Sequence, residues 1–188
     1  MKKRIVVGIT GASGSIYGIR LLEVLAGHAK VETHLVISRG AEETLRLENP
    51  AWSVDRVKSL ASAAYSPEDL SAPISSGSFS THGMAIIPCS MKTLGAVANS
   101  LAGDLLSRAA DVTLKERRIL IVSPRETPLH LGHLRQMAAV TEMGGVILPP
   151  IPAFYHQPKT VDDLINHTVS RVLDLFGIEN QLIKRWGA

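Results

Sequence analysis

The sequence predicts an α/β fold: a single-domain, doubly wound and mostly parallel sheet of the Rossmann-like type. Short β-branched runs alternate with segments of helical period along the whole chain. The length of 188 residues fits one domain, 1–188, with one core. Polar clusters follow four of the expected strands directly, which is where ligands bind in an open parallel sheet. We therefore expect a ligand site at the carboxyl edge of the sheet.

The first half of the chain alternates strand and helix twice. The run at 4–9 is β-branched without alternation, which is typical of a strand covered on both faces. Apolar residues at helical spacing predict a helix at 15–27. A second strand and helix are expected at 31–37 and 39–47. The later segment 65–82 is rich in Ser, Pro and Gly, and we expect a long functional loop there.

The second half continues this alternation. Strands are expected at 84–88, 118–122 and 145–148, and helices at 90–98, 104–115, 129–139 and 161–176. Pro149 and Pro150 end the last strand, because proline cannot donate a hydrogen bond to a neighbouring strand. Right-handed crossovers between the parallel strands then place helices on both faces of the sheet.

The composition limits the class of protein. The net charge is +3 and the basic residues are spread along the chain, which gives little support to nucleic-acid binding. Two Trp, three Tyr and three Phe are too few for an obvious base-stacking surface. Every apolar run is interrupted before the roughly 18 residues that cross a bilayer, and no export signal is expected. The single cysteine, Cys89, excludes an intramolecular disulfide, so we expect a cytoplasmic protein without a membrane partner.

The segment GITGASGS at 8–15 follows the first strand directly. Its glycines let the backbone approach an anion, and the helix that follows supplies free N–H groups and a favourable dipole. Thr10, Ser13 and Ser15 add hydroxyl donors. The segment predicts a cradle for the phosphate of a nucleotide-like cofactor; the simpler interpretation is a tight turn with a serine cap.

A nicotinamide dehydrogenase is one alternative for this glycine pattern. Ser38 and Arg39 stand where an acidic residue for the ribose is expected, although Arg39 would suit the 2′-phosphate of NADP. Tyr155 and Lys159 match the spacing of a short-chain dehydrogenase pair, but Pro158 prevents the helix on which that pair depends. Both observations weaken the dehydrogenase interpretation.

Cysteine and histidine chemistry is not favoured. Cys89 precedes a helix start, but we expect it to pack at the strand end and not to act as a nucleophile. Ser90 and Thr93 are better suited to binding phosphate or ring polar atoms. His130 and His133 lie three apart on one helical face, yet no third ligand accompanies them, so no metal is predicted.

A second set of polar residues predicts a second phosphate pocket. Their flanking segments are expected to begin or end at the same edge of the sheet: Lys115, Arg125, Tyr155 and Arg171. Arginine binds a phosphate with two parallel hydrogen bonds. The simpler interpretation is that each of these four residues is an isolated charge on the protein surface. Glu48 and Glu126 follow polar turns and would move protons if a pocket raised their pKa.

Segments along nearly the whole chain resemble one known family. They read TGASGSIYGIRLL, ISRGAEETLRLE, PCSMKTL, RAADVTLKERRILIVSPRETPL, GGVILPPIPAFYHQP and the terminal RWG. In this order they resemble the UbiX-like flavin prenyltransferases. The resemblance implies a flavoprotein-type fold and a metal-independent enzyme that joins a dimethylallyl group from dimethylallyl phosphate to N5 and C6 of reduced FMN. The prenylated FMN would serve a UbiD-like decarboxylase, in ubiquinone synthesis or in aromatic-acid breakdown.

The resemblance also implies roles for residues of this sequence. The implied FMN contacts are Gly11, Ala12, Ser13, Ser38, Ser90, Met91, Lys92, Thr93 and Arg125. Tyr155 and Arg171 would hold dimethylallyl phosphate, with Lys115 as a further phosphate partner. The implied catalytic residues, placed around the reacting flavin and the leaving phosphate, are Ser13, Glu48, Lys115 and Glu126. Cationic donors at the phosphate favour cleavage of the allylic C–O bond, because negative charge collects there in the transition state.

Family members typically form a homododecamer with sites between subunits, so the resemblance implies this assembly here. The loop 65–82 and Trp186 are candidate interface elements. Leu70 stands near a position where some relatives have Trp, which is expected to alter the shape of the prenyl pocket.

Two other functions stay open. An FMN-dependent decarboxylase of the related cysteine-decarboxylating group would share the fold, but the segments RETPL, FYHQP and KERR favour the prenyltransferase. A non-catalytic flavin carrier subunit of a decarboxylase would have no use for a second phosphate pocket.

Overall fold

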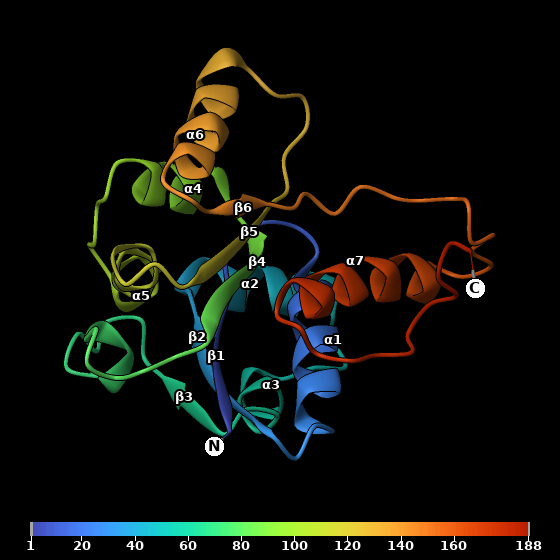
Figure 1. Cartoon of the computed structure of the whole chain (residues 1–188), viewed down its shortest axis with the longest axis horizontal. Coiled ribbons are helices and arrows are strands. Elements are labelled where there is room, and N and C mark those ends of the chain that lie inside the picture. The colour runs from blue at the N-terminus through green and yellow to red at the C-terminus, as the bar shows by residue number, and fades with distance from the viewer. Residues whose placement is uncertain (1, 188) are drawn as a thin grey trace.

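The computed structural model describes residues 2–187 and contains one parallel sheet of six strands in the order β3-β2-β1-β4-β5-β6 (Figure 1). The strands are β1 Lys3–Ile9, β2 Val31–Ile37, β3 Ala63–Tyr65, β4 Gly83–Cys89, β5 Ile119–Pro124 and β6 Val146–Ile147. The helices are α1 Ser15–Ala26, α2 Arg39–Glu48, α3 Val54–Lys58, α4 Met91–Ala98, α5 Leu105–Lys115, α6 Leu131–Glu142 and α7 Val161–Leu175. This is the predicted doubly wound, Rossmann-like α/β architecture.

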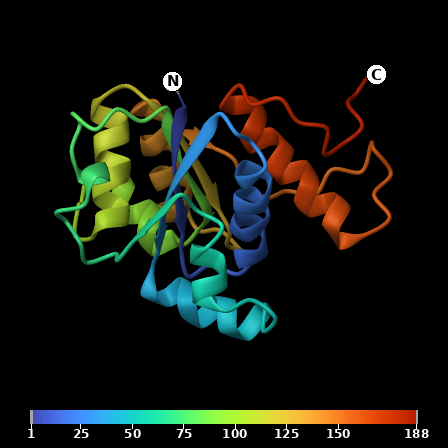
Figure 2. The same ribbon diagram turned by 90° about the horizontal axis from the view of Figure 1, so that it is seen from below.

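Helices cover both faces of the sheet, as Figure 2 shows with α5 in yellow-green on one side and α1 (blue) and α7 (red) on the other. The side chains of β1 alternate between the two cores. Ile5 and Val7 face the core that α1 and α7 complete, whereas Val6 faces the core with α4 and α5. A strand buried on both faces has no polar side to show, which is why its sequence reads as a continuous apolar run.

The strand order reverses at β1. This strand pairs with β2 on one side and with β4 on the other, with Gly8 opposite Val36 and Ile86. Chain connections leave β1 and β4 in opposite directions, so a crevice opens beyond their carboxyl ends. The topology therefore directs a ligand to the segments after β1 and β4.

The region between α2 and β4 contains more structure than its sequence predicts. The five-residue helix α3, the three-residue strand β3 and a 3₁₀ turn at Pro73–Ser75 occupy it. Elements this short carry too few residues for a periodic signal. β6 is also shorter than expected, at two residues, although Leu148 still donates its N–H to Val122 O (2.8 Å).

The helices differ from membrane spans. Within the described range 2–187, none combines the length and the apolar composition that crossing a bilayer requires.

Candidate active site

The polar clusters predicted at the strand ends do lie at one edge of the sheet. Segments 10–13, 38–40, 90–93 and 125–126 follow β1, β2, β4 and β5, which are neighbours in the parallel sheet. Thr10 joins the first and third of these segments. Its buried hydroxyl donates to Pro88 O (2.9 Å) and accepts from Ser90 N (2.7 Å). The end of β1 is thereby fixed to the start of α4.

The turn after β1 brings backbone close to backbone. A Cβ on Gly11 would come within 2.9 Å of the carbonyl carbon of Gly40, and Gly14 has a φ of +99°. Within residues 2–187, the N–H groups of Gly11, Ala12 and Ser13 donate to no protein acceptor. These three donors remain available to a ligand.

Glu48 occupies the N-terminus of α1, where the sequence predicts free N–H groups for a phosphate. Its Oε2 accepts from Gly14 N (2.8 Å) and from the N–H (3.3 Å) and hydroxyl (3.4 Å) of Ser15. Partial burial raises the pKa of Glu48, but hydrogen bonds from Ser13, Gly14 and Ser15 outweigh it and hold that pKa below its ordinary value. The prediction that the N-terminus of α1 has free N–H groups is therefore wrong for Gly14 and Ser15. The Glu48 carboxylate, at the end of α2, occupies the position that an external anion would take.

Asn49 extends this contact and was not identified from the sequence. Its amide nitrogen donates to the buried Ser15 hydroxyl (2.7 Å), so the Ser15 proton is directed to Glu48. A residue 34 positions away from its partner gives no local sequence signal.

Ser38 and Ser90 begin the next two helices at this edge. The Ser38 hydroxyl accepts from Ala41 N (3.2 Å) and caps α2. The Ser90 hydroxyl accepts from Thr93 N (3.3 Å) and donates to the Thr93 hydroxyl (3.1 Å), capping α4. Ser38 keeps its hydroxyl proton as a donor and Ser90 keeps one acceptor lone pair, and the positive end of each helix faces the crevice.

The end of β5 adds a cation to the crevice. Arg125 N donates to Cys89 O (3.1 Å), while its exposed guanidinium forms no ion pair with any residue of 2–187. The neighbouring carboxylate of Glu126 is exposed and accepts from Thr127 N (2.9 Å). Met91 and Lys92 follow Ser90, and Lys92 is exposed. This set of free N–H groups, hydroxyls and an unpaired guanidinium fits a phosphate-bearing, ring-containing ligand such as FMN.

Lys115 does not reach this edge within one chain. It ends α5 and precedes β5, so it lies at the amino edge of the sheet, and its ammonium pairs with Glu116 (2.5 Å). A helix that connects parallel strands runs antiparallel to them, which puts its last residue at the opposite edge. The predicted shared edge is wrong for Lys115.

Tyr155 and Arg171 belong to a separate cluster at the far end of α7. The Tyr155 hydroxyl contacts His167 Nε2 (3.2 Å), and Arg171 pairs with Asp174 (3.0 Å), as Arg185 also does (2.7 Å). Burial lowers the pKa of His167, and the nearby charges of His156 and Arg171 lower it further. Figure 1 shows the segment before α7 leading away from the sheet towards the C-terminus.

The residues of the disfavoured alternatives have the following contacts. Complete burial raises the pKa of the Cys89 thiol far above its ordinary value, as expected of a packed cysteine. Residues 155–159 form no helix, so the dehydrogenase pairing of Tyr155 with Lys159 is accidental. His130 caps α6 by accepting from Gly132 N (3.0 Å). Among residues 2–187, no group of three potential metal ligands comes together.

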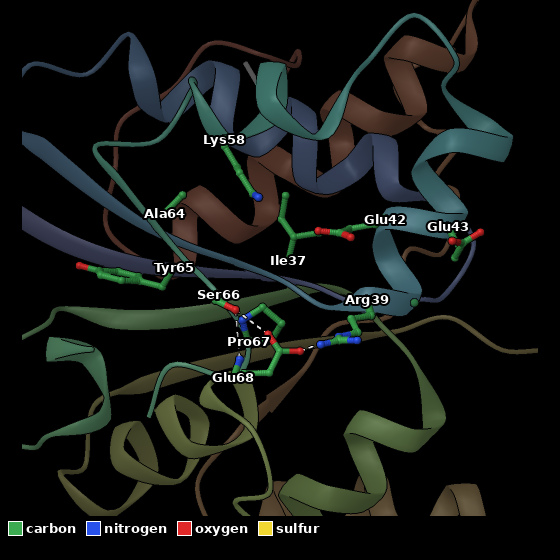
Figure 3. A pocket seen from close by; sticks show the side chains of 11 residues that line it. Ile37, Arg39, Glu42, Glu43, Lys58, Ala64, Tyr65, Ser66, Pro67 and Glu68 are labelled. Atoms are coloured by element: carbon green, nitrogen blue, oxygen red, sulfur yellow. Dashed lines mark hydrogen bonds and ion pairs between the residues drawn. The ribbon is translucent and has the colours of Figure 1, made fainter. Parts of the chain in front are cut away.

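A pocket of about 630 Å³ lies beside Ser38, at the ends of β2 and β3 (Figure 3). Arg39 pairs there with Glu68 (2.6 Å), which also accepts from the Ser66 hydroxyl (2.5 Å). Arg39 is therefore paired with a carboxylate in this pocket, and Lys58 is a second cation that lines it.

Comparisons with known proteins agree with this arrangement. The family model described as Flavoprotein matches residues 1–173. The chain is 55% identical over 186 residues to a protein named Flavin prenyltransferase UbiX from Escherichia coli (strain K12), covering 98% of each. It is 56% identical over 183 residues to the protein of that name from Thauera aromatica, covering 97% of this chain and 93% of the relative.

Solved structures show the same similarity in three dimensions. AnUbiX in complex with FMN and dimethylallyl pyrophosphate superposes with a TM-score of 0.97 at 47% identity, over 100% of this chain and 99% of that one. A dodecameric FMN-dependent UbiX-like decarboxylase from Escherichia coli O157:H7 gives 0.96 at 49% identity, over 98% and 100%. Peptidyl-cysteine decarboxylase EpiD, at 14% identity and 0.65 over 94% and 99%, shares the fold alone. The chain belongs to the UbiX-type family of flavin prenyltransferases.

Proposed function

We propose that residues 1–188 act as one flavin-binding domain that transfers a dimethylallyl group from dimethylallyl phosphate to N5 and C6 of reduced FMN. The observation that carries this proposal is the convergence of unpaired N–H, hydroxyl and guanidinium donors beyond β1, β2, β4 and β5. The family to which the chain belongs includes a structure described as a complex with FMN and dimethylallyl pyrophosphate.

The carboxyl edge of the sheet would hold the FMN. The backbone of Gly11, Ala12 and Ser13 offers three N–H groups, and Arg125 offers an unpaired cation. The remaining FMN contacts are proposed from the segments that begin α2 and α4: Ser38, Ser90, Met91, Lys92 and Thr93. Reduced FMN supplies an electron-rich ring that accepts the prenyl group.

Tyr155, Arg171 and Lys115 would bind the phosphate of the prenyl donor. Within one chain, Lys115 lies at the opposite edge of the sheet and Arg171 pairs with Asp174. We therefore propose a homo-oligomer, a dodecamer as described for one relative, in which neighbouring subunits contribute these residues to a shared site. Cations at the leaving phosphate lower the barrier, since negative charge concentrates there as the C–O bond breaks.

Three polar residues would manage protons around the reacting flavin. Glu48 is held as a carboxylate by Ser13 and by the N-terminus of α1, so it acts as an acceptor and orients the Ser13 hydroxyl. Glu126 is exposed beside Arg125 and is placed to take the proton that leaves C6, as is the released phosphate itself.

The product would pass to a UbiD-like decarboxylase, as one cytoplasmic protein to another. The single cysteine, buried and unpaired, suits that reducing compartment.

Mass spectrometry tests the reaction directly. Under anaerobic conditions, the protein with reduced FMN and dimethylallyl phosphate should yield a flavin heavier by one C5H8 unit, and a reaction without the donor is the control. A parallel reaction with the diphosphate identifies the preferred donor. An unchanged flavin mass, with flavin bound and donor intact, contradicts the proposal.

An FMN-dependent decarboxylase is the second candidate, because one relative at 49% identity is described in these words. Such an enzyme would release CO₂ from an aromatic acid with FMN alone. CO₂ release without any change in flavin mass would favour it over prenyl transfer.

A further inference from the structure

Tyr17 covers the turn that leads into α1. A Cβ on Gly14 would lie 3.0 Å from Cδ2 and 3.1 Å from Cε2 of the Tyr17 ring. The ring is half-buried against the core between the sheet and α1. Tyr17 therefore borders the three free N–H groups at 11–13, although it is not among the predicted site residues.

The same turn of α1 lies over the end of β4. A Cβ on Gly18 would come within 2.5 Å of Ile87 O, so helix and strand are in close contact there. Arg125 is fixed to the same strand end, since its N–H donates to Cys89 O (3.1 Å). Tyr17 and Arg125 thus belong to two segments that contact the end of β4.

The hydroxyl of Tyr17 differs from those of the other two tyrosines. Tyr65 contacts His34 Nδ1 (2.9 Å) and Tyr155 contacts His167 Nε2 (3.2 Å). Within the described residues, the Tyr17 hydroxyl forms no hydrogen bond, and the Arg125 guanidinium forms none either. A free hydroxyl donor and a free cation on segments that meet at one strand end are together complementary to an anionic oxygen.

We propose that Tyr17 is a further ligand-binding residue of this active site, whose hydroxyl donates a hydrogen bond to a phosphate oxygen that Arg125 also binds. This inference rests on the proposed function, which brings two phosphates to the site, that of FMN and that of the prenyl donor. The nearest acidic groups do not compete, because Glu48 is bonded to Gly14 and Ser15, and Glu126 to Thr127 N.

The protonation state of Tyr17 suits this role. Burial raises the pKa of its phenol, and the charge of Arg125 offsets only part of that rise. The hydroxyl therefore keeps its proton near neutral pH and acts as a donor.

The substitution Tyr17→Phe tests the inference, because it removes the hydroxyl and keeps the ring that packs on Gly14. We expect the affinity for one phosphate ligand to fall about tenfold, because the loss of one hydrogen bond to a charged group weakens binding by about this factor. A raised Kd for oxidised FMN identifies the flavin phosphate. A raised KM for dimethylallyl phosphate, with the Kd of FMN unchanged, identifies the donor phosphate. Riboflavin, which lacks the phosphate, should bind both proteins equally.

Tyr65→Phe is the matched control, since it removes a hydroxyl that contacts His34 and not the crevice. Unchanged FMN and donor binding in Tyr17→Phe, or an equal loss of riboflavin binding, would overturn the inference. An equal effect of Tyr65→Phe would do the same. Failure of the proposed function looks different, because the unaltered protein would then bind no FMN or prenylate none.

Discussion

At the residue scale, two contacts shape the turn between β1 and α1. Gly11 lets this turn touch the start of α2 at Gly40, and Glu48 at the end of α2 supplies the anion that the N-terminus of α1 attracts. Both contacts join α1 to α2, and the N–H groups at 11–13 between them stay free. The contacts with Gly40 and Glu48 thus fix the turn, and the backbone N–H groups at 11–13 remain available to a ligand.

Gly11→Ala should disrupt this turn. The added Cβ would lie 2.9 Å from backbone of Gly40, which cannot yield as a flexible side chain does. We expect a loss of about 1–3 kcal/mol in the free energy of unfolding, as overpacking causes, and at least tenfold weaker FMN binding. Urea unfolding and flavin fluorescence measure the two effects. Gly103→Ala is the control, since its Cβ would meet nothing within 4 Å.

Glu48→Gln should weaken the protein in a pH-dependent way. Removing the charge at the N-terminus of α1 should cost about 0.5–1 kcal/mol near pH 7. The pKa of Glu48 is lowered in the folded state, so the stabilisation is present above the unfolded pKa, roughly 4.3, and is lost as the pH falls through the folded value. Unfolding of both proteins at pH 7 and pH 3 measures this.

Glu43→Gln provides the comparison for that measurement. Glu43 lies on the same helix and pairs with Arg46 in solvent, where ion pairs contribute little. If Glu48→Gln matched Glu43→Gln at pH 7, the capping role of Glu48 would be wrong.

At the level of the elements, the long segment before β4 is held by one arginine of α5 and one that directly precedes β5. Arg108 Nε donates to Ser75 O (3.1 Å). Arg118, just before β5, donates to Gly77 O (2.7 Å), Phe79 O (3.0 Å) and the Thr81 hydroxyl (3.3 Å). A segment with little regular structure is ordered here by charged donors to its carbonyl groups.

Arg118→Ala should release this segment. Its side chain is 15% exposed, and three carbonyl or hydroxyl groups lose their donor together. We expect a loss of about 2 kcal/mol in unfolding free energy and faster hydrogen exchange and proteolysis within 65–82. Arg135→Ala, at an exposed position of α6, should leave both unchanged. Unaltered exchange in 65–82 would show that other contacts order the segment.

At the scale of the whole molecule, the proposed phosphate-binding residues lie in three places. The carboxyl edge of the sheet carries Arg125, the amino edge carries Lys115, and the cluster by α7 carries Tyr155 and Arg171. Assembly of several chains is the arrangement we propose to bring them together.

Tyr155→Phe and Arg171→Ala should impair use of the donor and leave FMN bound. We expect the KM for dimethylallyl phosphate to rise about tenfold or more, because each loses a hydrogen bond to an anion. Arg185→Ala is the control, since Arg185 pairs with the same Asp174. Loss of flavin from the Tyr155 or Arg171 variant would contradict the assignment of this cluster to the donor.

Mixed oligomers test whether subunits share a site. Gly11→Ala impairs the flavin side and Arg171→Ala the donor side, so each variant alone should lose most of its activity when FMN and donor are kept below the Kd and KM of the unaltered protein. When the two variants are refolded or co-expressed together, activity should return. Some sites would then combine the intact flavin side of an Arg171→Ala subunit with the intact donor side of a Gly11→Ala subunit. No recovery in demonstrably mixed oligomers would show that each chain builds its own site.

Local sequence patterns are enough to predict the order of the main elements, the parallel sheet and the residue types at its carboxyl edge. These features are local. The spacing of apolar residues predicts each helix or strand, and a glycine or serine turn after a strand predicts a ligand site, each within a segment of about 20 residues. They are sufficient to place Gly11 to Ser13, Ser38, Ser90 and Arg125 at one edge of the sheet.

Packing in three dimensions determines how the remaining polar groups are used. It puts the Glu48 carboxylate at the N-terminus of α1, fixes Ser15 through Asn49, places Lys115 at the opposite edge and brings the segments of Tyr17 and Arg125 together at the end of β4. Each of these outcomes depends on helix direction or on partners distant in the sequence. A polar side chain reads the same whether it is paired or free, and only packing determines which of them remain available to a ligand.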